Sequence, residues 1–272
     1  MSLWHYAFVQ QALVAGAVTA IVAGFVGPFV TARNMGFAVH GLAEVGFTGA
    51  AGAVLVGLPA ELGLLAACFA AALAIGVLGV RLRERDIAIG TILAFGLGLG
   101  VLFLSLYTRY ATEAFSILFG TIMAVSRDDV VRSAVVGAVV LVALAVVYRP
   151  LRFATVDPEA AEARGVPMRV ISAVFLLILA LAVAEAAQVV GVLLVLTLLI
   201  TPAGAAQRLT PHPGLVILYS VVIAVVATVG GIACGVVTSL PVSFFVASIS
   251  LAVYLTARLI GPRAPAARRA AA

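Results

Sequence analysis

The chain contains successive runs of about 20 apolar residues, and these runs limit the folds open to it more than any other feature. A helix of that length rises 1.5 Å per residue and crosses a hydrocarbon core about 30 Å thick. The two runs on either side of Glu185 and Gln188 also fit one long bent helix. We therefore predict an all-α polytopic membrane protein with eight or nine transmembrane helices, at roughly 8–30, 36–58, 61–80, 87–107, 130–148, 168–188, 190–206, 215–238 and 240–260.

Short polar joints connect these runs and leave no room for a separate soluble domain. Hydrophobic residues make up 64% of the 272 residues and charged residues 10%, far below the charged share of a soluble domain. We expect one transmembrane domain over residues 1–261 and a disordered cytoplasmic tail over 262–272. Between the fourth and fifth runs, residues 107–129 have an apolar centre too short to cross, which suggests a segment that dips into the interface or re-enters.

The arginines predict the orientation of the chain. The sequence has no lysine, and every arginine except Arg109, Arg127 and Arg132 falls in joints on one side of the membrane. Because positively charged joints stay in the cytoplasm, an odd number of spans with the N-terminus outside and the C-terminus inside is favoured. No basic patch is interleaved with aromatic residues, so the net charge of +5 reflects orientation and not nucleic-acid binding.

One apolar run carries two ionisable residues, His40 and Glu44, within NMGFAVHGLAEVGFTGAAGA. They are one helical turn apart, so they share a helix face, and Thr48 continues this polar stripe as a possible lining of a pathway. Ionisable groups inside a span are costly and mark a ligand site, a pathway or a proton relay. Imidazole and carboxylate also suit zinc, manganese or iron(II), although the two groups could instead satisfy each other.

The glycines of this run, at 36, 41, 46, 49 and 52, weaken a regular helix. They indicate either close helix packing or a broken helix of the kind that builds transporter sites. In the fourth span, Gly90, Ala94 and Gly98 have the spacing of a small-residue contact, and Gly96 and Gly100 provide a second small edge.

A short helix is predicted in the joint YRPLRFATVDPEAAEARGVPMRV. Asp157 is a plausible N-cap before Pro158, and Gly165 a plausible stop, which gives an inner-side helix at about 157–165. This helix either links two spans or docks a cytoplasmic partner. Further along, Pro202 is expected to kink or end its span. No nucleotide-binding or hydrolase motif is present, so we assign no catalytic residues and expect a transport subunit, not an enzyme.

Taken together, these segments resemble the permease subunit of the ABC importers for zinc, manganese and iron(II), over roughly residues 24–261. The resemblance lies in NMGFAVHGLAEVGFTGAA, DIAIGTILAFGLGLGVLFLS, LFGTIMAVSRDD, and the FATVDPEAAEARGV joint followed by VVGVLLVLTLLITPAGAAQRLT. It implies a type II importer fold in the bacterial cytoplasmic (inner) membrane, a second permease copy that is most simply identical, and no tightly bound cofactor. It also implies cytoplasmic ATPase subunits, on which ATP would be hydrolysed, and an extracytoplasmic metal-binding protein.

The resemblance also assigns roles to residues. Asp157, Glu159, Ala160 and Gly165 match the family's coupling-helix pattern, and His40 and Glu44 occupy the positions where members commonly carry an aspartate followed by a histidine. The ligand types are kept and their order is exchanged, so the identity of the metal is not transferred.

Three other classes compete with this interpretation. A permease for iron-siderophores, haem or cobalamin shares the small-residue run, but such chains are longer. A proton-coupled secondary transporter would use His40 and Glu44 as a relay, yet gives no purpose to the helix at 157–165. An intramembrane enzyme would need a catalytic set that one histidine and one glutamate do not supply.

Overall fold

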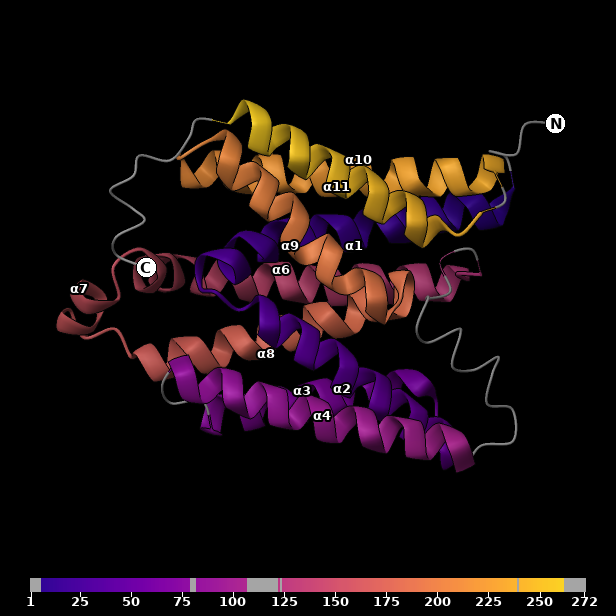
Figure 1. Cartoon of the computed structure of the whole chain (residues 1–272), viewed down its shortest axis with the longest axis horizontal. Coiled ribbons are helices and arrows are strands. Elements are labelled where there is room, and N and C mark those ends of the chain that lie inside the picture. The colour runs from indigo at the N-terminus through magenta and orange to yellow at the C-terminus, as the bar shows by residue number, and fades with distance from the viewer. Residues whose placement is uncertain (1–5, 79–81, 107–121, 123, 239, 262–272) are drawn as a thin grey trace.

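The computed structural model describes residues 6–78, 82–106, 122, 124–238 and 240–261, and within these ranges the ordered elements are all helices. The bounds of the helices are α1 Ala7–Ala32, α2 Gly36–Leu55, α3 Ala60–Leu78, α4 Leu82–Leu106, α6 Arg127–Val156, α7 Pro158–Ala163, α8 Met168–Val190, α9 Val192–Leu209, α10 Pro213–Thr238 and α11 Val242–Ile260 (Figure 1). The predicted re-entrant segment at 107–129 falls largely outside the described residues, as does the predicted tail at 262–272.

Among the described residues, nine helices are long and apolar enough to cross a membrane, at the upper limit of the predicted eight or nine. The two runs flanking Glu185 and Gln188 are separate helices and not one bent element. Gly191 divides them with a φ of 86°, a left-handed conformation that glycine adopts without a Cβ penalty. The prediction of an all-α polytopic protein is therefore confirmed.

The helices pack in two groups on either side of a central pair, α6 and α8 (Figure 1). Helices α9, α10 and α11 lie together with α1, whereas α2 packs against α3 and α4. Helix α8 contacts α3 on one side and α6 on the other, and α2 also contacts α8 and α9. Helix α2 is thus enclosed between the α3–α4 pair and the centre of the bundle, and two thirds of its span is buried.

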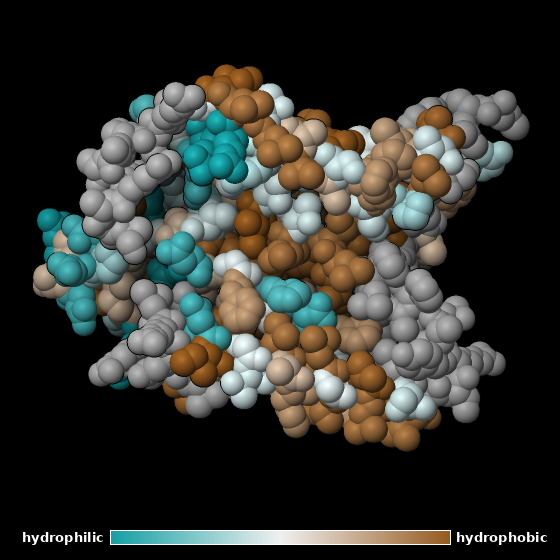
Figure 2. Space-filling model, viewed as in Figure 1, coloured by the Kyte–Doolittle hydropathy of each residue, from teal (hydrophilic) through white to brown (hydrophobic). Residues whose placement is uncertain are grey.

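The two ends of the bundle differ in polarity. Hydrophilic residues gather at the end that carries α7, whereas the rest of the coloured surface is mainly hydrophobic to neutral, apart from a small hydrophilic group near its middle (Figure 2). At the opposite end, Arg132 of α6 forms an exposed ion pair with Glu61 of α3. Both of these residues belong to joints that the arginine pattern places outside, so the ion pair is consistent with the predicted orientation.

The short helix predicted at about 157–165 is present as α7. The Asp157 carboxylate accepts a hydrogen bond from the Ala160 backbone N–H at 3.0 Å, and Pro158 occupies the first helical position. Gly165 follows the helix with a φ of 81°, as expected of a residue that ends it. The local sequence therefore determines both ends of this helix.

The glycines of α2 serve close packing, because α2 is one continuous helix. A Cβ built on Gly49 would lie 2.2 Å from the Gly63 carbonyl oxygen, and one on Gly63 would lie 2.0 Å from the Gly49 carbonyl oxygen. The backbones of α2 and α3 therefore touch at this point, a contact typical of small residues in membrane helices.

Replacing Gly49 by alanine is expected to force α2 and α3 apart, because the new methyl group would meet backbone and not a flexible side chain. Overpacking of this kind costs about 1–3 kcal/mol, and we expect a lower thermal unfolding midpoint. Gly98→Ala is the matched control, since a Cβ at Gly98 has no heavy atom within 4 Å. If both variants unfold at the wild-type temperature, the close contact between α2 and α3 is wrong.

Two expectations, the contact edge of α4 and the effect of Pro202, are corrected in part. On α4, Gly96 and Gly100 face Val45, Phe47 and Thr48 of α2, and Gly90 faces the Phe37 ring, while Gly98 of the predicted edge faces open space. Of the kink or end expected at Pro202, the end is wrong, because α9 continues through this residue to Leu209, and the kink stays a prediction. A helix can retain a proline where neighbouring helices support the freed backbone group, and α9 packs against α1, α10 and α11.

Candidate functional site

The candidate site lies in the first half of α2. Glu44 is eight residues, or about 12 Å, from the first residue of the helix, and His40 is one turn closer to it. Glu44 is buried, with 9% of its surface exposed, and His40 is half-buried. The two side chains interact electrostatically, as their four-residue spacing predicts. The structure therefore brings together the two ionisable groups identified in the sequence.

The packing of α2 leaves these two side chains on a separate face. Gly46 and Gly49 face α3, where Cys68 and Gly63 approach them closely. At 100° per residue, His40 and Glu44 point roughly away from these glycines. The α3 contact therefore fixes the back of α2, and the face opposite carries the imidazole and the carboxylate.

Thr48 contributes to the site through its hydroxyl group. It donates to the Gly96 carbonyl of α4 at 2.6 Å and approaches the Glu44 carbonyl of its own helix at 3.2 Å. The hydroxyl therefore joins α2 to α4 one turn beyond Glu44. Thr48 is almost fully buried, and its role in lining a pathway stays a prediction.

The ligand set that one chain offers is small. Among the described residues, no group of three or more histidine, cysteine, aspartate or glutamate side chains comes together. The Glu44 carboxylate accepts no hydrogen bond from the residues that the structure describes. One nitrogen and one carboxylate suit a borderline divalent transition metal that takes its other ligands from water or from another chain.

A second buried carboxylate, Glu185 of α8, was not singled out by the sequence as a functional residue. Its Oε1 accepts hydrogen bonds from Thr19 of α1 at 2.7 Å and from Ser133 of α6 at 2.5 Å, while its Oε2 has no partner among the described residues. Glu185 is 4% exposed. Glu185 connects three helices, whereas the Glu44 carboxylate makes no such link to another described helix.

An acidic residue within an apolar run was the available signal for Glu185. From the sequence, Glu185 raised only the question of a helix boundary. Its hydrogen-bond partners could not be identified, because Thr19 and Ser133 lie 166 and 52 residues away. Their convergence depends on how α1, α6 and α8 pack, which no local pattern reveals.

The predicted coupling residues lie together on α7. Asp157 caps the helix, Glu159 occupies its first turn and is exposed, and Ala160 supplies the capped N–H. Gly165 ends the helix. The guanidinium of Arg164 stacks over the Phe153 ring of α6, with 5.5 Å from Cζ to the ring centroid. These contacts hold a six-residue helix against the end of α6 while leaving Glu159 open to a partner.

A family profile described as the ABC 3 transport family matches residues 5–261. The chain belongs to this family. The match spans all ten described helices, so the ABC 3 assignment rests on the whole bundle and not on one motif. The predicted relationship to ABC importer permeases is confirmed, as is a multi-pass protein of the bacterial cytoplasmic membrane.

Individual relatives of this ABC 3 chain cover most of its length. It is 31% identical to the manganese transport system membrane protein MntC of Halalkalibacterium halodurans, over 85% of this chain and 79% of the relative. It is 28% identical to the protein of the same name from Listeria innocua, over 96% of this chain and 93% of the relative.

A solved structure described as PsaBC from Streptococcus pneumoniae in complex with Fab has the same fold. One of its chains superposes with a TM-score of 0.85 at 28% identity, covering 96% of this chain and 94% of that chain. The type II importer architecture expected from the sequence is therefore supported by a close structural match.

Proposed function

We propose that this chain is the permease subunit of an ABC importer for a divalent transition metal ion, with manganese as the first candidate and zinc and iron(II) as alternatives. Relatives named as manganese transport membrane proteins align over nearly the whole chain and support the metal class. The His40–Glu44 pair on α2 is the observation that carries the proposal, because it supplies metal-ligand chemistry at membrane depth.

In the proposed mechanism, His40 and Glu44 act as transient ligands. The Glu44 carboxylate offsets part of the cost of removing the cation from water, and the imidazole supplies a nitrogen ligand. A transport site must also release its ion, and two ligands from one chain bind more weakly than a closed structural site with four. The partial ligand set of one chain therefore suits transport better than storage.

We infer that a second permease copy completes the path. One chain offers two of these ligands, and an identical partner would supply the same pair across a shared axis. A separate metal-binding protein would deliver the ion from outside. Identical copies are the simplest arrangement, and a heterodimer would keep the chemistry if its partner also carried a nitrogen and an oxygen ligand.

ATP hydrolysis is assigned to separate cytoplasmic subunits that dock on α7. The helix lies at the polar end of the bundle (Figure 2), and Glu159 in its first turn is exposed. Because Asp157 and Gly165 fix its two ends, α7 would transmit a push from an ATPase as one unit.

The function is tested with the complex of this chain and its ATPase, purified after co-expression. In proteoliposomes with the binding protein, ATP hydrolysis and metal uptake should both rise on addition of manganese, zinc or iron(II), and the metal with the largest rise is the substrate. Metal uptake without any ATPase would overturn the ABC mechanism and favour the secondary transporter. Stimulation by siderophores or cobalamin and not by free metal would favour the alternative permease class.

Coupling has its own test. Glu159→Arg reverses an exposed charge on α7, and Gly165→Pro forces the residue that ends α7 to abandon its positive φ. Either change should abolish metal-stimulated ATP hydrolysis and uptake while leaving metal binding to the permease unchanged, as measured by titration of the purified complex. Wild-type coupling in both variants would show that α7 is only a link between spans.

A further inference from the structure

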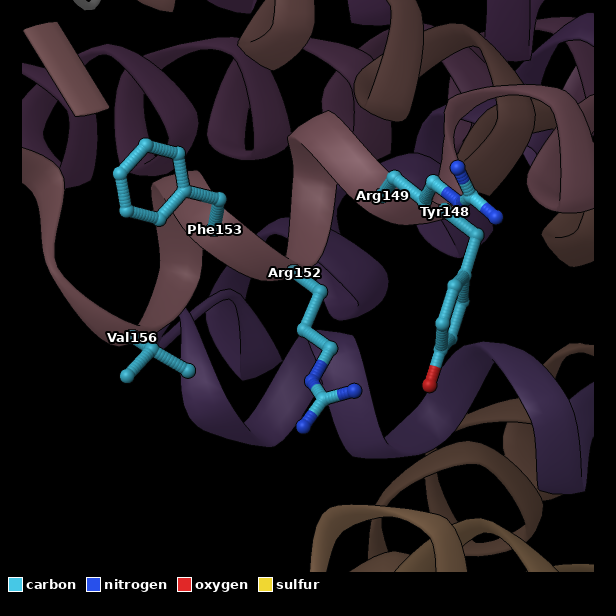
Figure 3. Close-up of a pocket in the computed structure, with 5 residues that line it drawn as sticks. All are labelled: Tyr148, Arg149, Arg152, Phe153 and Val156. Carbon is cyan, nitrogen blue, oxygen red and sulfur yellow. The ribbon is translucent and has the colours of Figure 1, made fainter. Parts of the chain in front are cut away.

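The inner end of α6 carries an open pocket of about 310 Å³ that the transport function does not use. Tyr148, Arg149, Arg152, Phe153 and Val156 line it. Figure 3 shows the side chains of Tyr148 and Arg152 extending in the same direction from the helix, with Arg149 beside Tyr148. Both arginines are exposed, and within the described ranges neither has an acidic partner.

This pocket lies at the end of an exposed apolar stripe. Five valines spaced three or four residues apart run along one face of α6, and each is more than half exposed: Val131, Val135, Val139, Val142 and Val146. Arg149, Phe153 and Val156 extend the same face, because they follow Val146 at three- and four-residue steps. The exposed apolar face of the span therefore becomes basic at its inner end.

The position of the arginines along α6 matches the level of lipid headgroups. A capping box between Ser126 and Asp129 fixes the outer end of the helix. Arg149 lies 20 residues beyond Asp129, or about 30 Å, which is the thickness of the hydrocarbon core. If Asp129 is at the outer interface, Arg149 and Arg152 reach the inner one, where Tyr148 also has the position expected of an interfacial aromatic.

We propose that this pocket binds the headgroup of an acidic phospholipid of the inner leaflet. Each guanidinium group can donate to the oxygens of a phosphodiester, and the Tyr148 hydroxyl adds a donor. Toward the membrane centre, the exposed side chains of Val146 and Val142 present apolar surface to the glycerol and upper acyl carbons. Inorganic phosphate shares the charge but would leave the adjoining valines uncovered, and an ATPase would approach α7 from the cytoplasm and not along the valine stripe.

The occupant would lie next to the helix that docks the ATPase. Val156 is the last residue of α6, Asp157 caps α7, and Arg164 stacks on Phe153, which itself lines the pocket. A lipid held here therefore contacts the same aromatic ring that supports α7. The lipid composition of the inner leaflet would act on coupling through this ring.

The test uses the full-length chain co-purified with its ATPase and equilibrated with vesicles of equal phosphatidylglycerol and phosphatidylcholine content. Lipids that remain bound are counted by native mass spectrometry. We expect the wild-type protein to retain more phosphatidylglycerol than phosphatidylcholine. In the double variant Arg149→Gln/Arg152→Gln the ratio of the two retained lipids should fall about thirtyfold, from the usual contribution of two basic residues near an anionic surface. Arg169→Gln, an exposed inner-side arginine outside the pocket, is the control and should keep it.

The wild-type protein gives a second measurement that does not depend on a variant that folds. At about 1 M salt the screening length falls to about 3 Å, and the preference for phosphatidylglycerol should largely disappear. Equal retention of both lipids by the wild type, or an unchanged preference in the double variant, would overturn the proposal.

Other occupants of the pocket have distinct signatures, each of which also overturns the proposal. Displacement of phosphatidylglycerol by inorganic phosphate would identify a soluble-anion site. Loss of the ATPase from the double variant with unchanged lipid preference would identify an ATPase contact. Dissociation into single permeases with unchanged preference would place this face between two copies of the chain.

Discussion

Glu44→Gln is expected to reduce metal uptake at least about 100-fold while leaving the folded permease intact. Glutamine keeps the shape of the side chain and removes the charge that would offset the desolvation of the cation. Loss of an outer-shell partner alone can lower metal affinity up to about 100-fold, and a ligand should matter at least as much. Uptake of radioactive or stable-isotope metal into proteoliposomes measures the effect, and size-exclusion chromatography with the ATPase measures assembly.

His40→Ala should have the same outcome, since it removes the nitrogen ligand on the same face of α2. Two variants serve as matched controls. Glu61→Gln removes an exposed carboxylate at the start of α3, and His212→Ala removes an exposed imidazole from the joint between α9 and α10. Both controls should transport at the wild-type rate. Wild-type uptake in both Glu44→Gln and His40→Ala would eliminate the site.

Glu185→Ala is expected to destabilise the permease by about 2 kcal/mol or more. The change leaves the hydroxyl groups of Thr19 and Ser133 without their acceptor in a buried region and opens a cavity between α1, α6 and α8. Hydrogen bonds between membrane helices are individually modest, so the cavity adds an essential part of the effect. The midpoint of thermal unfolding, followed by loss of the monodisperse chromatographic peak, is the measurement.

Glu185→Gln separates the hydrogen bonds from the charge. The amide oxygen of glutamine can accept from both hydroxyl groups, so this variant should remain close to wild type in stability. Thr19→Val and Ser133→Ala should each lose part of the stability that Glu185→Ala loses, and much less than the sum when combined with it. Independent, additive losses would show that Glu185 does not link these helices.

The two buried glutamates therefore make opposite predictions. Glu44→Gln should stop transport and keep stability, whereas Glu185→Ala should lower stability whatever its effect on transport. The difference follows from what surrounds each carboxylate: two donors are fixed on the Glu185 Oε1, and none is recorded on Glu44 in the described residues. Burial of a charged group does not by itself identify a transport site.

Features encoded locally were predictable from the sequence. Apolar runs specify membrane helices because each must satisfy its own backbone hydrogen bonds in lipid, and the described helices follow those runs closely. Asp157, Pro158 and Gly165 specify α7 because a cap, a fixed φ and a positive φ act within a few residues. The spacing of His40 and Glu44 placed them on one face for the same reason.

Features that depend on which helices meet could not be predicted. Gly98 fits a small-residue spacing as well as Gly96, and only the packing of α4 on α2 decides that Gly96 and Gly100 make the contact. Pro202 carries the signal of either a kink or a helix end, and only its packing neighbours allow α9 to continue through it. The sequence does not show that Glu185 links three helices, because its hydrogen-bond partners are distant along the chain.

Asp157 has a consequence beyond the start of one helix. It is the C-cap of α6 and the N-cap of α7 at once, so no spare residue separates a 30-residue helix from the six-residue helix that follows. Such a joint allows little independent movement of the two helices. A tilt of about 5° along the roughly 45 Å of α6 would move its inner end by about 4 Å, and α7 would travel with it. A movement of α7 driven by an ATPase would therefore be transmitted directly to α6.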